Sequence, residues 1–189
     1  MSLGKWKKIK TEEVYECGKF YRVEKDKVIT PGKKEGTYYV IRRDQESVVI
    51  IVLDKKGNFF LTKQHRYPVN KFSIEFPAGW IDKNETVLNA AKRELAEEMS
   101  LSSDDWKKIG EYVQVLGMSS LKMNVFLAKD CYKSEIIKKD PLDYNLHDTL
   151  MLNHKKLKEK IANSEIIDSV TLCAFAIAES QGVFNDYKK

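Results

Sequence analysis

The chain has 189 residues, 42% hydrophobic and 32% charged, which is typical of a globular protein with one sizeable domain and space for a small appendage. Its 33 basic and 28 acidic residues are interspersed and give a net charge of +5, which favours solubility or an anionic substrate over nucleic acid. The longest apolar run, Val48 to Leu53, is too short to span a membrane, and MSLGKWKKIK has no signal-peptide pattern. Three widely separated cysteines fit reduced thiols in a cytoplasmic protein.

The N-terminal part of the sequence has the pattern of strands and turns. Residues 13–29 alternate and are rich in Val, Tyr and Phe, which predicts a strand. TPGKKEG (30–36) predicts a turn, and TYYVIRR (37–43) predicts a second strand. We therefore expect a small β module at 1–45, followed by the main domain at 46–189.

The main domain alternates predicted strands with helices. VVIIVLD, from Val48, is a continuous apolar run typical of a strand buried on both faces, and KKGN predicts a turn into FFLTKQHRY. Two further strands, WKKIGEYVQVL and LKMNVFLAKD, are joined through GMSS, and residues 130–149 are expected to be irregular. Helices are predicted at 153–163 and 168–181. This order predicts an α+β fold with a mixed sheet covered by helices.

The segment GWIDKNETVLNAAKRELAEEMSL (79–101) predicts one amphipathic helix. With Asn84 as the N-cap, the helix would run from Glu85 to Met99. Four apolar side chains then form a single stripe that we assign to the core: Leu88, Ala91, Leu95 and Met99.

Three glutamates gather beside that stripe, at the end of the helix where acids are least favoured. Glu94, Glu97 and Glu98 fall within an arc of about 100°. Like charges at this spacing cost a few tenths of a kcal/mol per pair, and acids in the last turn oppose the helix dipole. Divalent cations would remove both costs, because hard cations take carboxylate oxygens as ligands. The alternative is a solvated acidic face.

The same segment resembles the Nudix signature, G-x5-E-x7-R-E-U-x-E-E-x-G-U, where U is a bulky aliphatic residue. Eight of nine fixed positions match: Gly79, Glu85, Arg93, Glu94, Leu95, Glu97, Glu98 and Leu101. Ser100 stands where the signature has glycine, so we expect a locally altered turn with metal binding retained.

The resemblance extends to the ADP-ribose pyrophosphatase-like branch through KQHRYPVNKFSIEFPAGWID (63–82), the N-terminal β module and the C-terminal helix pair. It implies a Nudix-type α/β/α sandwich preceded by the β module. It also implies a homodimer in which the β module crosses to the partner, since a module of this size cannot easily bury both faces alone.

The implied activity is hydrolysis of the pyrophosphate bond of a nucleoside diphosphate linked to another moiety, ADP-ribose or a related nucleotide sugar, with Mg²⁺ or Mn²⁺. The resemblance makes Glu94 and Glu98 the main metal ligands, places Glu97 close by, and adds the backbone carbonyl of Ala78. Arg93 would orient these glutamates, with Glu85 as its ion-pair partner. The alternative for Arg93 and Glu85 is an ordinary surface pair.

Other positions are implied substrate contacts. Arg66 matches an arginine that contacts substrate phosphate, and the alternative is a plain strand-end arginine. Glu75 would approach the metal site or buttress its loop. Four aromatic residues of the β module include candidates for stacking on the base, although packing is the alternative for each: Trp6, Tyr15, Phe20 and Tyr38.

The catalytic base lies outside the signature. Related enzymes place a glutamate in a late loop, but the corresponding DPLDYNLHDTLMLN contains none. Asp148 is the first candidate, followed by His147 and Asp143. Two alternative functions stay open: hydrolysis of a capped RNA end or dinucleotide cofactor, and nucleotide-sugar sensing with little turnover. The sequence does not identify the sugar, the preferred metal or the pathway.

Overall fold

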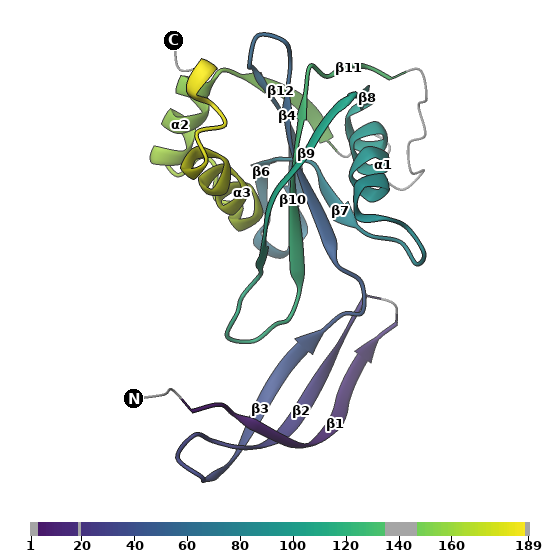
Figure 1. Ribbon diagram of the computed structural model, residues 1–189, viewed down its shortest axis with the longest axis vertical. Helices are drawn as coiled ribbons and strands as arrows, with labels where there is room; N and C mark the ends of the chain where they lie inside the picture. The colour runs from purple at the N-terminus through teal and green to yellow at the C-terminus, as the bar shows by residue number, and fades with distance from the viewer. Residues whose placement is uncertain (1–3, 19, 135–146, 188–189) are drawn as a thin grey trace. The chain divides into compact units, whose positions relative to one another are not determined.

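The computed structural model describes residues 4–18, 20–134 and 147–187, and their contacts divide the chain into two units (Figure 1). The first unit comprises the described residues of 1–46 together with 112–122, and the second comprises those of 47–111 and 123–189. The first division, between residues 46 and 47, lies one residue from the domain boundary expected at 45/46. Residues 112–122, which we expected in the main domain, make their contacts with the β module.

The first unit is built on a three-stranded antiparallel sheet. Its strands are β1 (Lys7–Cys17), β2 (Tyr21–Ile29) and β3 (Glu35–Arg42), in the order β1-β2-β3. The single strand predicted over 13–29 is wrong, because the chain reverses at Gly18, which has φ 48°. Alternation continues on both sides of this turn, so the period-2 pattern alone does not reveal it.

Residues 112–122 pack along β3. The amide of Ile41 donates to the carbonyl of Met118 at 2.8 Å, and the Tyr38 hydroxyl donates to the carbonyl of Gly117 at 2.5 Å. These bonds explain why the connection belongs with the β module.

The second unit contains a seven-stranded mixed sheet with the strand order β12-β5-β4-β10-β9, with β6 beside β5 and β7 beside β4. β4 and β10 are parallel, whereas β5 is antiparallel to β4, β6 and β12. The strand bounds are β4 Ser47–Leu53, β5 Phe59–Arg66, β6 Lys71–Glu75, β7 Ala78–Trp80, β9 Asp105–Val113, β10 Lys122–Lys129 and β12 His147–Leu152. A separate two-stranded sheet pairs β8 (Leu101–Ser102) with β11 (Tyr132–Lys133).

Helices cover both faces of this sheet (Figure 1). On one face, α1 (Val87–Met99) packs its Ala91 and Leu95 against Val48, Ile50 and Val52 of β4. On the other face, Phe59 contacts His154 of α2 (His154–Ala162), Phe175 of α3 (Ser169–Ser180), and Phe184, which follows α3. Every residue of β4 is buried, as the apolar run predicted. The α+β class, the mixed sheet and the α/β/α sandwich are confirmed.

Both ends of α1 differ from the expectation. The N-cap is Thr86, whose hydroxyl accepts from the Asn89 amide at 3.2 Å, so Asn84 is not the cap and the helix begins two residues later than predicted. The altered turn expected at Ser100 is also wrong. Ser100 adopts the left-handed conformation itself, with φ 54°, and its amide closes the helix onto the Ala96 carbonyl at 3.0 Å.

The irregular segment predicted at 130–149 is wrong at both ends, where β11 and the first residues of β12 are strands. β12 is an edge strand paired with β5, so its polar sequence lacks the apolar signal of a buried strand. Asp143 lies outside the described residues. The two predicted C-terminal helices agree with α2 and α3 to within one residue at each end.

Candidate functional site

Arg93 joins the loop before α1 to the glutamates of that helix. Its Nε and Nη2 donate to the two carboxylate oxygens of Glu85 at 3.1 and 3.0 Å. Nη1 donates to Glu94 Oε1 at 2.8 Å and to Glu97 Oε2 at 2.9 Å, and Nη2 also reaches the Trp80 carbonyl at 2.7 Å. Arg93 therefore binds Glu85, the ion-pair partner named from the sequence, and also Glu94, Glu97 and the Trp80 carbonyl.

The Arg93–Glu85 pair is more than a loose surface contact. The side chains are 27% and 16% exposed, and the bidentate geometry suits guanidinium and carboxylate. The hydrogen bond from Arg93 holds the pKa of Glu85 below its usual range. Glu85 Oε2 also accepts from the Asp82 amide at 3.1 Å, which anchors the loop preceding α1.

Gly79 provides the space that the Glu94 carboxylate occupies. A Cβ on Gly79 would lie 2.0 Å from Glu94 Cδ and Oε1, where no side-chain atom fits. Gly79 lies on β7, opposite Val48 of β4, and α1 packs against both strands. Ala78, whose carbonyl is the expected backbone ligand, directly precedes this glycine in β7.

The Glu94 carboxylate is largely enclosed, with 12% of its side chain exposed. Burial raises its pKa, against the opposing effect of Arg93, and the neighbouring Glu97 charge adds to the increase. Glu97 and Glu98 are half-buried on the same side of α1. A buried carboxylate beside further carboxylates favours a cation, because a cation offsets both desolvation and repulsion.

The donor set fits a hard divalent cation by its chemistry, since Glu94, Glu97, Glu98 and the Ala78 carbonyl all offer oxygen. Among residues 4–18, 20–134 and 147–187, no group of three or more His, Cys, Asp or Glu side chains converges into a ready-made coordination sphere. Arg93 Nη1 instead binds Oε1 of Glu94 and Oε2 of Glu97, one oxygen of each carboxylate.

Arg66 is held by a buried carboxylate. Its Nε donates to Glu75 Oε1 at 2.9 Å, and its Nη2 forms a very short contact with Glu75 Oε2. The Glu75 side chain is 6% exposed, whereas Arg66 is half exposed. The hydrogen bonds to Glu75 raise the pKa of Arg66, with smaller contributions from the nearby charges of Asp168 and Glu98. Glu75 thus positions Arg66 close to the last turn of α1.

Strand register determines which candidates share a face of the sheet. Glu75 lies opposite Thr62, whereas Asp148 lies opposite Lys63, and adjacent residues of β5 point to opposite faces. Phe60, two residues before Thr62, packs in the core beneath α1. Glu75 and Arg66 are therefore on the α1 face, and Asp148 is exposed on the other face. The backbone of His147 lies opposite Gln64.

The aromatic residues of the first unit divide between two environments. Trp6 and Tyr38 contact each other edge to face, with ring centroids 5.6 Å apart, and line a hollow of about 490 Å³ with Asp26, Arg42 and Met118. Tyr15 and Phe20 are exposed and lie outside this hollow. The structure therefore brings together only Trp6 and Tyr38 of the four stacking candidates.

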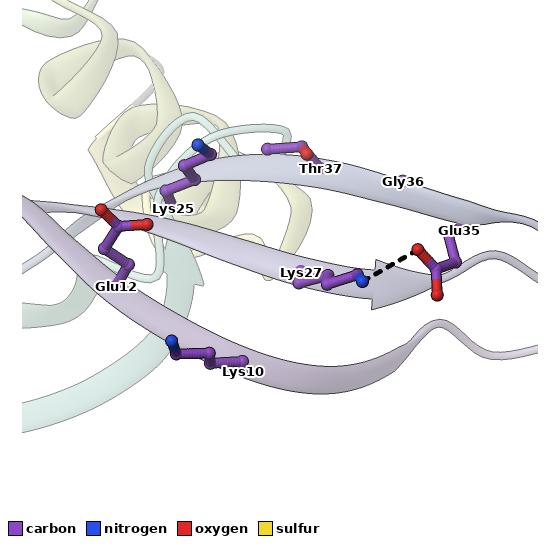
Figure 2. A pocket seen from close by; sticks show the side chains of 7 residues that line it. All are labelled: Lys10, Glu12, Lys25, Lys27, Glu35, Gly36 and Thr37. Carbon is purple, nitrogen blue, oxygen red and sulfur yellow. Dashed lines mark ion pairs between the residues drawn. The ribbon is translucent and has the colours of Figure 1, made fainter.

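The other face of the same three-stranded sheet carries a second hollow, lined by charged side chains (Figure 2). Lys27 pairs with Glu35 at 2.9 Å, and Glu12 lies opposite Lys25 in the β1–β2 ladder. Exposed pairs of this kind contribute little energy and imply no particular ligand. We assign no chemistry to this surface.

Among the described residues, no helix is long and apolar enough to cross a membrane. The three cysteines, Cys17, Cys131 and Cys173, are free thiols, and burial raises the pKa of Cys131 to about 11.

A family model described as the NUDIX domain matches residues 43–144, just over half of the chain. A methanol dehydrogenase activator of Bacillus methanolicus is 26% identical over 129 residues, covering 68% of this chain and 69% of that protein. An ADP-ribose pyrophosphatase of Bacillus subtilis (strain 168) is 28% identical over 124 residues, covering 66% of each. The match thus spans about two thirds of each relative.

A solved structure supports the same fold. A crystal structure of an ADP compounds hydrolase superimposes with a TM-score of 0.84 and covers 98% of both chains. At 19% sequence identity, this likeness establishes the fold alone.

Proposed function

This chain belongs to the Nudix family of hydrolases, and we propose that it cleaves the diphosphate of a nucleoside diphosphate linked to a sugar, with ADP-ribose as the first candidate. The observation that carries the proposal is the Arg93-centred arrangement of Glu85, Glu94 and Glu97 beside Gly79, which reproduces the family signature in three dimensions. The similarity to an ADP-ribose pyrophosphatase supports the choice of substrate.

A divalent cation is the implied cofactor, and we propose Mg²⁺, with Mn²⁺ as a substitute. Bound at this site, it would neutralise diphosphate oxygens and lower the pKa of water. Glu94, Glu98 and the Ala78 carbonyl would hold it, with Glu97 close by. Arg66, fixed by Glu75, would bind diphosphate oxygens from the same face of the sheet.

In the proposed reaction, water attacks one phosphorus and the bond from that phosphorus to the bridging oxygen breaks. The water gives up a proton to a base, and the departing phosphate carries away the negative charge. Asp148 remains our proposed base from the sequence, although the strand register offers no support for it.

A panel of diphosphates tests the substrate class. With Mg²⁺ or Mn²⁺, we expect ADP-ribose to yield AMP and ribose 5-phosphate, identified by mass spectrometry. A capped RNA end or a dinucleotide cofactor should be cleaved more slowly. If no diphosphate is cleaved but ADP-ribose stabilises the protein against heat, the sensor alternative is correct.

Arg66 gives the first mutational prediction. We expect Arg66→Lys to raise KM for ADP-ribose about tenfold with folding retained, because lysine keeps the charge but loses bidentate geometry. Arg66→Ala should also destabilise the protein by about 1–3 kcal/mol, since it leaves the buried Glu75 carboxylate without its partner. Steady-state kinetics and thermal unfolding measure the two effects. Adding Glu75→Gln to Arg66→Ala should restore the stability but not the KM. An unchanged KM in both Arg66→Lys and Arg66→Ala would contradict the phosphate role.

We also propose a homodimer formed through the β module, in a cytoplasmic protein whose thiols are reduced. Ten of the eleven residues of β1 are exposed, including Ile9, Val14 and Tyr15, and a partner would cover this apolar surface. Light scattering at micromolar concentration should give twice the 21.9 kDa chain mass. A mass near 21.9 kDa would refute the dimer.

A further inference from the structure

The second unit has a hollow of its own, and the Arg66–Glu75 pair is part of its lining. It has a volume of about 380 Å³ and is formed by the end of β5, by η1 (Tyr67–Val69), by β6, and by the start of α3. We call it the α3 pocket. Its lining combines Arg66 and Glu75, which the strand register places on the α1 face, with Asp168, the N-cap of α3, so the hollow is not confined to one face of the sheet.

Asp168 is fixed with one carboxylate oxygen available. Its Oδ2 accepts from the Thr171 amide and from the Thr171 hydroxyl, both at 2.8 Å. Its Oδ1 has no hydrogen-bond donor within the described part of the chain. Two hydrogen bonds to one oxygen limit rotation of the carboxylate, so Oδ1 is a positioned acceptor on a residue that lines the pocket.

The rest of the lining combines apolar and hydroxyl groups. Val69 and Ile167 are about half exposed and provide apolar walls, and Ser73 and Ser169 provide hydroxyls. The ionisable residues are two cations, Arg66 and Lys71, and two carboxylates, Glu75 and Asp168, so the charges cancel. The pocket therefore suits an uncharged group that has both C–H faces and hydroxyls, the properties of a sugar ring.

We propose that the α3 pocket binds the sugar attached to the diphosphate, with Asp168 Oδ1 accepting a hydrogen bond from a ring hydroxyl. This assignment rests on the proposed hydrolase function, since Arg66 would bind the diphosphate at the mouth of the same pocket. Asp168 then determines specificity: it touches the sugar and takes no part in bond breaking.

The test compares two substrates that differ only in this group: ADP-ribose, and the methyl ester of ADP, in which a methyl group replaces the sugar. Asp168→Asn converts the carboxylate to a neutral amide, and Ile167→Trp fills the pocket, with Val69→Trp as a second blocking variant. Met151→Trp is the matched control, because Met151 is 58% exposed, against 49% for Ile167 and 56% for Val69, and does not line the pocket.

We expect the Asp168 and Ile167 variants to lower kcat/KM for ADP-ribose about tenfold or more and to leave the methyl ester unaffected. Met151→Trp should change neither. An equal loss with both substrates would overturn the proposal, because Asp168 would then act on catalysis or folding. Unchanged ADP-ribose kinetics in all variants would overturn it as well.

Calorimetric titration with ribose 5-phosphate in the presence of Mg²⁺ measures binding to the pocket without requiring hydrolysis. If the wild-type protein cleaves neither substrate, the proposed function fails, and this titration still decides the pocket. The sugar site is supported if Asp168→Asn and Ile167→Trp weaken this binding and Met151→Trp does not. Absent binding, or binding insensitive to all variants, refutes it.

Discussion

Glu98→Gln is expected to lower the turnover of ADP-ribose about a thousandfold while leaving the fold intact. Glu98 lies in the last turn of α1, beside Glu94 and close enough to Arg66 to raise the pKa of that arginine. It therefore connects the proposed metal ligands with the proposed phosphate contact. Loss of a direct metal ligand removes several kcal/mol of transition-state stabilisation, and each 1.36 kcal/mol is a factor of about ten.

Thermal unfolding separates this loss from a folding defect. The amide removes one of three neighbouring negative charges, so the metal-free melting temperature should not fall. In the wild type, Mg²⁺ should raise the melting temperature, because a ligand that binds only the folded state stabilises it. The variant should lose most of this increase. Wild-type turnover in Glu98→Gln would show that the metal site lies elsewhere.

Asp148→Asn, in the same assay, tests whether Asp148 is the catalytic base. A general base contributes about 10²–10⁴-fold, and a loss of that size would support Asp148. The strand register, which places Asp148 and Glu75 on opposite faces of the sheet, favours little change. If Asp148→Asn turns over ADP-ribose at the wild-type rate, either another residue is the base or a metal-activated water attacks without a separate base.

The sequence anticipated those parts of the fold that depend on local pattern. The spacing of the glutamates and of Ala91 and Leu95 placed α1, and the apolar run from Val48 identified a strand buried on both faces. The turn at Gly18 and the edge strand β12 were missed, because neither carries a burial signal of its own. In both cases pairing with a distant or reversing segment determines the structure.

In the candidate site too, local sequence predicts some contacts, whereas others depend on how distant elements pack. Glu85 and Arg93 were paired from the signature, and helix geometry explains why Arg93 also reaches Glu97, four residues along. The contact of Arg93 with the Trp80 carbonyl depends on how β7 docks on α1, which no local pattern predicts. Asp168 carries no functional signal in the sequence, and its place in the same pocket lining as Arg66 depends on the fold.

Gly79→Ala is expected to reduce turnover strongly at a modest cost in stability. The new Cβ would lie 2.0 Å from the Glu94 carboxylate, which must move. Because the displaced atoms are the end of a side chain, we expect a loss of about 1–3 kcal/mol in the free energy of unfolding. The same movement takes a proposed ligand away from the metal, so turnover should fall by at least about a hundredfold.

The matched control and a double variant identify the cause of this loss. Gly117→Ala makes the same substitution where an added Cβ has no neighbour within 4 Å, and it should change neither turnover nor stability. In a Glu94→Ala background the steric conflict is absent, so Gly79→Ala should then have little further effect on the free energy of unfolding. A full stability loss in that background would mean that the glycine is needed for β7 itself. Wild-type turnover in Gly79→Ala would mean that the carboxylate position seen here is not the one used in catalysis.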